Sequence, residues 1–152
     1  MANKLSQLGY KKLEEVEGCR LIAYKDGAGV WTIGYGQTGK DIVAGLTWAK
    51  EQANAALPVA VALREKVIND LGLVLRQCEF DALILFEYNT GAFQAGLVHT
   101  LLDKIKARDM VGILLAFTEW RKVRNPVTKQ LVDDGGLLKR RMIEAIMYFG
   151  NY

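Results

Sequence analysis

The hydrophobic positions at the start of the chain follow a helical period. Apolar residues recur every three to five positions with charged residues between them, and they are Leu5, Leu8, Leu13 and Val16. This spacing predicts an amphipathic helix over residues 3–17. Gly18 follows immediately and is a natural stop signal for it.

Beyond Gly18 the apolar positions alternate, as they do in strands. The alternating residues are Leu21 and Ala23, followed by Trp31, Ile33 and Tyr35. The segment between the two groups, residues 26–29, has the composition of a tight turn. The pattern therefore predicts a helix followed by a β-hairpin.

The rest of the chain is helical in pattern. Thr47 is expected to cap a helix through Leu57, and Pro58 to bend this helix or begin a new one that reaches Leu71. A central helix follows, with one apolar face formed by Phe80, Leu83, Ile84 and Tyr88. Further helices are predicted over 97–107, 111–123 and 137–149, with Asp109 as the N-cap of the helix over 111–123.

These elements predict an α+β fold class. We expect a single domain over residues 1–152, with a small N-terminal hairpin lobe and a larger C-terminal helical lobe. An extended polymer could lie in a cleft between the two lobes. The length of 152 residues and the 51% hydrophobic content agree with one globular core.

The net charge and the lengths of the apolar runs indicate which classes of partner to expect, among anionic polymers, nucleic acids and membranes. The formal charge of +3 favours approach to an anionic polymer such as a bacterial wall. No basic run with interleaved aromatic residues is present, so we expect no nucleic-acid partner. The longest apolar run, residues 55–63, is interrupted by Pro58 and is shorter than the roughly 20 residues of a membrane helix. The N-terminus carries lysines without an apolar core, so neither a signal peptide nor stable membrane insertion is expected.

The possible metal ligands are few. Cys19, Cys78 and the single His99 have no familiar zinc spacing. We expect no metal or other cofactor, and we expect the two cysteines to be free, buried thiols of a protein made in the cytoplasm.

Three residues of the N-terminal part form a candidate catalytic group. Glu17 closes the predicted helix beside apolar residues, which favours the protonated form of its carboxyl group. Asp26 lies in a polar turn, where water and backbone amides favour the ionised form, and Thr32 on the second strand could bind the same water molecule. An acid opposite a water-holding carboxylate is what glycoside hydrolysis requires.

Several sequence blocks resemble those of a known family. Glu17 is followed by eight residues, Asp26, five residues and Thr32, which opens the run Thr32-Ile33-Gly34-Tyr35-Gly36. The block 80–91 ends in Asn89-Thr90-Gly91, and residues 136–144 read Gly-Leu-Leu-Lys-Arg-Arg-Met-Ile-Glu after Trp120. Together these blocks resemble the phage-type lysozymes, the endolysins of glycoside hydrolase family 24. The chain departs from the family pattern at residues 91–93 and 124–134.

The resemblance implies a lysozyme-like fold and a muramidase that cleaves the β-1,4 bond between N-acetylmuramic acid and N-acetylglucosamine in peptidoglycan. Glu17 would be the general acid, with Asp26 and Thr32 preparing water. Arg140 would orient Glu17, and Tyr35 and Asn89 would support or contact the substrate. The resemblance also implies a monomer that acts in the periplasm after a holin has permeabilised the membrane, and so causes lysis of the host cell.

Other interpretations of the sequence stay open at this point. Glu17 could be a solvated helix-end residue, Asp26 a turn residue and Thr32 an ordinary strand residue. A lytic transglycosylase also needs a glutamate but not Asp26, and a lysozyme-like protein could bind the wall without cleaving it. Whether the product is inverted or retained depends on the separation of the two carboxyl groups.

Overall fold

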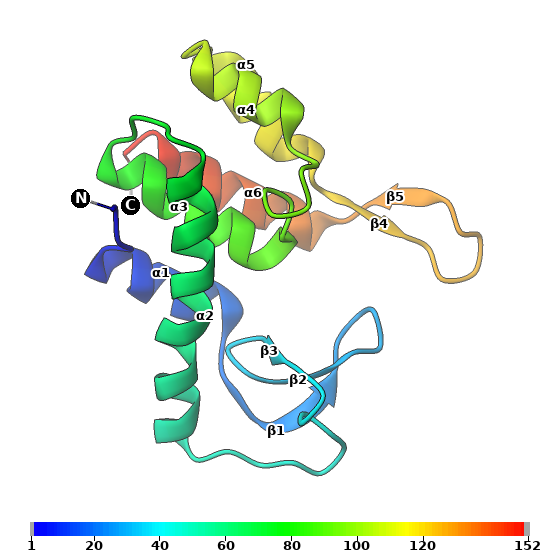
Figure 1. The fold of residues 1–152 in the computed structure, drawn as a ribbon. Helices are drawn as coiled ribbons and strands as arrows, with labels where there is room; N and C mark the ends of the chain where they lie inside the picture. The colour runs from blue at the N-terminus through cyan, green and yellow to red at the C-terminus, as the bar shows by residue number, and fades with distance from the viewer. Residues whose placement is uncertain (1, 151–152) are drawn as a thin grey trace.

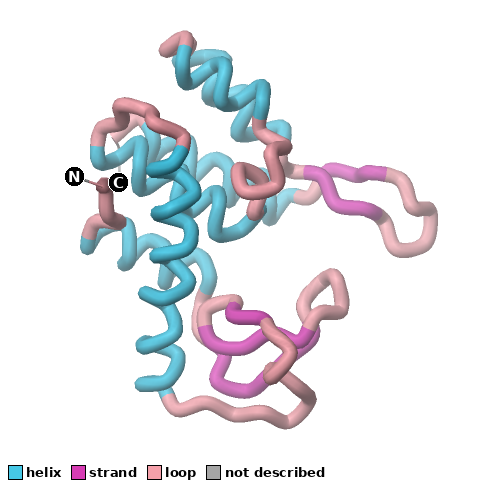
Figure 2. The backbone as a smooth tube through the Cα atoms, in the orientation of Figure 1, coloured by secondary structure: helices cyan, strands magenta, loops and turns pink. Residues whose placement is uncertain are grey.

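The computed structural model of the protein describes residues 2–150. A three-stranded sheet forms a small lobe, and helices form the larger part of the molecule (Figure 1). The long helix α2, Lys50–Asp70, leads from the small lobe to the helices (Figure 2). This arrangement confirms the predicted α+β fold with an N-terminal hairpin lobe.

Helix α1 spans Gln7–Glu17 and ends where the sequence predicts. It begins later than expected because Ser6 is its N-cap, accepting a hydrogen bond from the Gly9 amide. At the other end Gly18 has φ 64°, a conformation that glycine adopts at little cost, and its amide donates to the Glu14 carbonyl.

The predicted hairpin is formed by β1, Arg20–Lys25, and β2, Trp31–Gly34. The short strand β3, Gln37–Thr38, pairs with the other side of β2, which gives the antiparallel order β1-β2-β3. Tyr24 lies opposite Thr32 in the register, and the turn between the strands falls at the predicted residues 26–29.

Helix α2 corrects the predicted N-cap and excludes one of the two roles expected for Pro58. Its N-cap is Ala49 and not Thr47, because Thr47 forms a bridge to Ile22 at the edge of β1. Pro58 lies inside one continuous helix and does not start a new one. The buried positions recur at helical spacing on both sides of the proline, so one packing face continues through it, and these positions are Ala53, Leu57, Val61, Glu65 and Ile68.

Helix α3, Gln77–Thr90, is the centre of the helical lobe. All residues from Glu79 to Glu87 are buried, so the helix is enclosed on every side and not on one face as predicted. It packs against α1, α2 and the C-terminal helix α6, Gly135–Tyr148. Around Phe86 the rings of Phe93, Phe117 and Trp120 pack edge to face with centroid distances of 5.9, 5.4 and 5.6 Å.

The predicted helix over 111–123 is shorter than expected. Helix α4 spans His99–Lys106, and α5 spans Met110–Glu119 with Asp109 as its confirmed N-cap. Residues beyond α5 form β4, Lys122–Arg124, which pairs with β5, Leu131–Asp133. The Asn125 side chain accepts hydrogen bonds from two amides of the connecting turn, so local turn chemistry outweighs the helical pattern there.

The cysteines confirm one expectation and correct another. Cys19 and Cys78 are free, as predicted, but both are half-buried rather than buried. Within residues 2–150 no group of three His, Cys, Asp or Glu side chains could hold a metal ion. None of the helices over this range has both the length and the apolar character that crossing a bilayer requires.

Candidate active site

Glu17 lies at the junction of the two lobes, at the last position of α1. Arg140 on α6 donates a hydrogen bond through Nη2 to Glu17 Oε1, and only 13% of each side chain is exposed. The other carboxylate oxygen, Oε2, lies close to Gly36, since a Cβ atom added to this glycine would be 3.6 Å from it. Glu17 is therefore held by the helical lobe on one side and borders the sheet lobe on the other.

Asp26 and Thr32 meet at one backbone group of the hairpin, the peptide of Val30. The Asp26 amide and the Thr32 hydroxyl both donate to the Val30 carbonyl, each at 3.0 Å. The Asp26 carboxylate in turn accepts at Oδ1 from the amides of Ala28 and Val30, at 2.9 and 2.8 Å. The turn therefore fixes one carboxylate oxygen, and the Val30 carbonyl links the aspartate to the threonine.

Two oxygens of this pair are available to a ligand. Within the described part of the chain no hydrogen bond occupies Asp26 Oδ2, and the Thr32 hydroxyl has used only its proton, so its lone pairs can accept. Thr32 is 3% exposed, whereas Asp26 is half-buried in the turn. Each of these two oxygens can therefore accept a hydrogen bond from a water molecule that reaches it.

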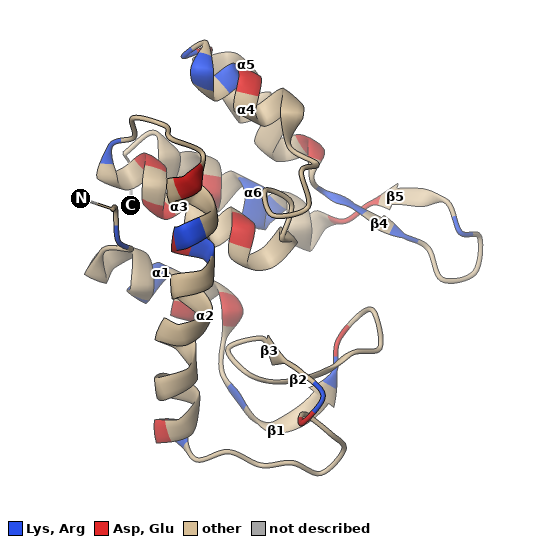
Figure 3. Cartoon of the chain, viewed as in Figure 1, with Lys and Arg blue, Asp and Glu red and all other residues tan. Residues whose placement is uncertain are grey.

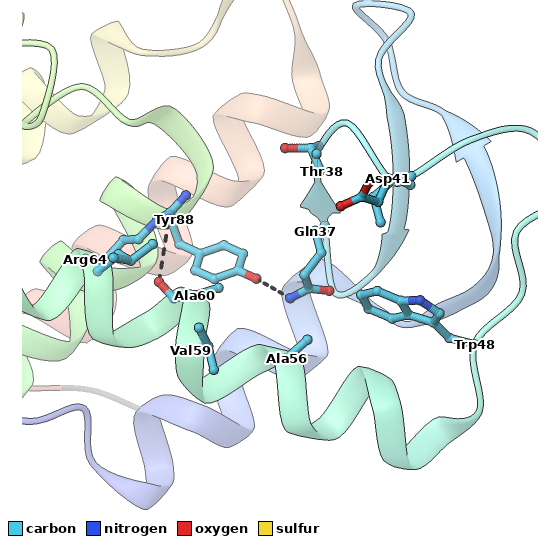
Figure 4. A pocket seen from close by; sticks show the side chains of 13 residues that line it. Gln37, Thr38, Asp41, Trp48, Ala56, Val59, Ala60, Arg64 and Tyr88 are labelled. Atoms are coloured by element: carbon cyan, nitrogen blue, oxygen red, sulfur yellow. Dashed lines mark hydrogen bonds between the residues drawn. The ribbon is translucent and has the colours of Figure 1, made fainter.

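Two grooves border these residues. The first, of about 560 Å³, lies between β3 with its following loop and the helices α2 and α3; Gln37, Trp48, Arg64 and Tyr88 line it (Figure 4). The second, of about 710 Å³, lies between the β1–β2 turn and the end of α3, near the start of β4. Gly36 lines the first groove beside Glu17, and Gly27 lines the second beside Asp26. The three candidate residues themselves line neither groove; Glu17 borders the first at Gly36, and Asp26 precedes Gly27 of the second.

Tyr88 on α3 lines the first groove and is hydrogen-bonded to the sheet lobe. Its hydroxyl accepts from Gln37 Nε2 at 3.0 Å (Figure 4) and donates to the Tyr35 carbonyl at 2.9 Å. Burial, with a further contribution from the negative charge of Glu17, raises the pKa of Tyr88 above its ordinary value. The hydroxyl therefore stays protonated and links the sheet to α3.

Tyr35 does not line either groove. Its side chain is 3% exposed, and its hydroxyl accepts from Lys50 Nζ at 2.7 Å and donates to Asn54 Oδ1 at 3.1 Å. These contacts tie the sheet to α2. A supporting role agrees with this position, whereas direct contact with a substrate in the two grooves does not.

Asn89 lines the second groove, and its Oδ1 accepts from Arg141 Nη2 at 2.6 Å. Arg141 is fully buried and also contacts Glu144, through Nη2 to Oε1 at 3.0 Å and through Nε to Oε2 at 3.0 Å. Arg140 Nε lies 3.2 Å from the same Glu144 Oε1. Arg141 and Glu144 thus belong to one contact network with Arg140 and Asn89; of these four residues, only Arg140 and Asn89 were assigned a role from the sequence.

Burial sets the proton affinities of this cluster. Desolvation raises the pKa of Glu144 to about 7 against the opposing pull of Arg141 and Arg140. Desolvation also lowers the pKa of Arg141. Burial works to lower the pKa of Arg140 as well, but its hydrogen bond to Glu17 and the charges of Glu17 and Glu144 raise it overall. Arg140 therefore stays cationic beside Glu17.

Comparison with known proteins agrees with this geometry. The pattern of the family described as phage lysozyme matches residues 14–144. The endolysin of Acyrthosiphon pisum secondary endosymbiont phage 1 is 32% identical over 145 residues, covering 95% of this chain and 97% of the relative. The SAR-endolysin of Enterobacteria phage PA-2 is 35% identical over 132 residues, covering 85% of this chain and 74% of the relative.

A solved structure extends the similarity to the fold. The endolysin from Escherichia coli O157:H7 phage FAHEc1 superposes with a TM-score of 0.83 at 33% identity, over 99% of this chain and 96% of that one. The similarity in sequence and in fold spans both lobes. This chain therefore belongs to the phage lysozyme family.

Proposed function

We propose that this endolysin hydrolyses the β-1,4 bond between N-acetylmuramic acid and N-acetylglucosamine in peptidoglycan, with Glu17 as the general acid. Asp26 and Thr32 hold the water molecule that attacks the anomeric carbon. The observation that carries the proposal is the placement of these groups. Glu17 Oε2 borders the first groove at Gly36, and Asp26, which shares the Val30 carbonyl with Thr32, precedes Gly27 of the second groove.

The contacts of Glu17 suit a proton donor. Only Oε1 is engaged by Arg140, so Oε2 is the oxygen that can deliver a proton to the leaving group. The small exposure of the side chain keeps bulk water from competing for this proton. As the glycosidic bond breaks and Glu17 becomes negative, Arg140 stabilises the charge that forms.

The contacts of Asp26 and Thr32 suit the handling of water. Asp26 Oδ2 can take a proton from the water molecule, while the Thr32 oxygen accepts its second hydrogen. Because an attacking water between the sugar and the second carboxylate reaches the face opposite the leaving group, this arrangement predicts inversion at the anomeric carbon. NMR of the first sugar anomer released from a defined glycan measures this outcome.

The grooves suit an extended, partly anionic polymer. The first presents Trp48 and Tyr88 together with Arg64, and the second presents Trp120 with Lys122 and Arg124. Aromatic faces pack against sugar rings, and cations attract the carboxylates of stem peptides. Figure 3 shows the basic residues of β4 and the following loop, which extend this positive character outward.

We further infer that the protein is made in the cytoplasm as a monomer and reaches the wall when a holin permeabilises the inner membrane. The chain's own described helices offer no spanning segment. Expression in Escherichia coli checks this route: we expect growth to continue until chloroform is added, and then rapid lysis. Lysis without chloroform would instead indicate an export route of the kind that the name SAR-endolysin denotes for the relative.

The catalytic assignment is tested with purified peptidoglycan. Glu17→Gln keeps the size of the side chain but cannot donate the proton, so we expect it to lose about 10³-fold of the reducing ends released per minute. Its thermal unfolding should remain close to that of the wild type. Near-wild-type release by this variant would refute the role of Glu17. A 1,6-anhydro product, detected by mass spectrometry, would show a lytic transglycosylase, and binding to sacculi without release would show a non-catalytic wall binder.

A further inference from the structure

We propose that Glu144 is a positioning residue of this active site, whose buried carboxylate holds Arg140 against Glu17 and Arg141 against Asn89. This inference rests on the proposed roles of Glu17 and Asn89. It concerns a residue that does not itself reach either groove.

The contacts form one chain across the site. Glu144 Oε1 lies 3.2 Å from Arg140 Nε and 3.0 Å from Arg141 Nη2, so one oxygen serves both arginines. The far side of Arg140 reaches Glu17, and the same Nη2 of Arg141 reaches Asn89 at 2.6 Å. Glu144 is thus the common acceptor that joins the proposed acid to the proposed sugar contact.

Besides the Glu144 carboxylate, each arginine has few other contacts that could hold its guanidinium group in place. Arg141 is fully buried over the ring of Phe86, with its guanidinium carbon 4.9 Å from the ring centroid. Arg140 has one further acceptor, the Leu85 carbonyl, at 3.5 Å from Nη2. Without Glu144, Arg140 would keep Glu17 as its carboxylate partner, Arg141 would keep none among the described residues, and the two buried cations would repel each other.

The charge of Glu144 also acts on the contact between Arg140 and Glu17. The ionisable groups that act on Glu144 are Arg141 and Arg140 on its own helix and Glu17 on α1, while α3 contributes the neutral amide of Asn89, which contacts Arg141. When Glu144 is ionised, it offsets part of the positive charge that Arg140 presents to Glu17. The burial that raises the pKa of Glu144 to about 7 places this effect near neutrality.

Glu144→Gln tests the proposal because it keeps the shape and removes the charge. We expect a roughly 10-fold or larger fall in kcat from misplacement of Arg140, and a several-fold rise in KM from release of Asn89. We also expect the basic limb of the pH–activity profile to move, because the charge that Glu144 places beside Arg140 is lost. A purely structural role would lower the amount of active enzyme and leave KM and the position of the limb unchanged.

Glu79→Gln is the matched control. Glu79 is another buried glutamate shared by two arginines, Arg76 and Arg108, but it lies outside the site. We expect this variant to lose stability while its KM and its basic limb stay at the wild-type values. An unchanged KM and limb in Glu144→Gln, or equal shifts in both variants, would overturn the proposal.

Glu144→Asp keeps the proposal testable if Glu144→Gln does not fold. Its shorter side chain cannot reach Arg140 while it keeps contact with Arg141, so kcat should fall and KM should change little. Wild-type kcat in this variant would contradict the positioning role. If the wild-type enzyme has no activity on peptidoglycan, the proposed function is wrong. If the wild type is active and the Glu144 variants have the same kcat, KM and pH profile, only this inference is wrong.

Discussion

Arg140 on α6 donates a hydrogen bond to Glu17 at the end of α1, across 123 positions of the sequence. The contact joins α1 to α6 within the larger lobe at Glu17, the residue that borders the smaller lobe. It therefore couples the folding of the C-terminal helix to the orientation of the proposed proton donor.

Replacement of Arg140 should affect stability and activity together. Arg140→Gln leaves Glu17 and Glu144 without their shared cation, so we expect a loss of about 3 kcal/mol in the free energy of unfolding, and a lower kcat. Urea unfolding and release of reducing ends measure the two effects. Arg121→Gln is the control, because its ion pair with Asp133 is more exposed and should contribute less than about 1 kcal/mol. Wild-type kcat in Arg140→Gln would show that Glu17 needs no orienting partner.

Thr32→Val isolates the hydroxyl at the proposed water site. Valine has nearly the same shape and suits a strand, so β2 should persist, while the water molecule loses one of its two acceptors. We expect kcat to fall roughly 10- to 100-fold with KM nearly unchanged. Steady-state kinetics on a defined glycan provide the measurement, and circular dichroism checks the fold. Full activity would assign Thr32 to the strand alone.

Gly36→Ala tests the close approach between the sheet and Glu17. Gly36 has φ 92°, and a Cβ atom there would lie 3.6 Å from Glu17 Oε2 and 3.8 Å from Tyr88. We expect a loss of about 1–2 kcal/mol in the free energy of unfolding from the backbone conformation, with reduced activity because the new methyl group borders the acid. Gly39→Ala, where a Cβ atom would meet nothing within 4 Å, should be close to neutral in the free energy of unfolding. Equal effects of the two substitutions would contradict this interpretation.

The pH dependence of stability should carry the signature of Glu144. Its pKa is about 7 in the folded protein against 4.5 ordinarily, so between these values the folded state holds a proton that the unfolded state has lost. The stability of the wild type relative to Glu144→Gln should therefore be greatest below pH 4.5, fall as the pH rises towards 7, and level off above it.

Urea unfolding of both proteins at several pH values measures this difference. The lowered pKa values of Glu15 and Asp109 act in the opposite direction but only at acidic pH, and they are common to both proteins. A constant difference across the range would show that Glu144 is not perturbed by burial.

The sequence by itself determined the local features of the protein. Gly18 ended the first helix, residues 26–29 made the hairpin turn, and Asp109 capped α5, because each depends on neighbours within a few positions. The spacing of Glu17, Asp26 and Thr32 likewise identified the candidate group, and Val30 then joins two of its members through local hydrogen bonds.

Only the tertiary structure decided the features that depend on distant partners. Helix α2 continues through Pro58 because one buried face packs on both sides of the proline. Thr47 is not the N-cap of this helix because it forms a β-bridge to Ile22. The cluster in which Glu144 joins Arg140 to Arg141 could not be inferred from spacing, because burial and the convergence of α1, α3 and α6 determine which charges meet.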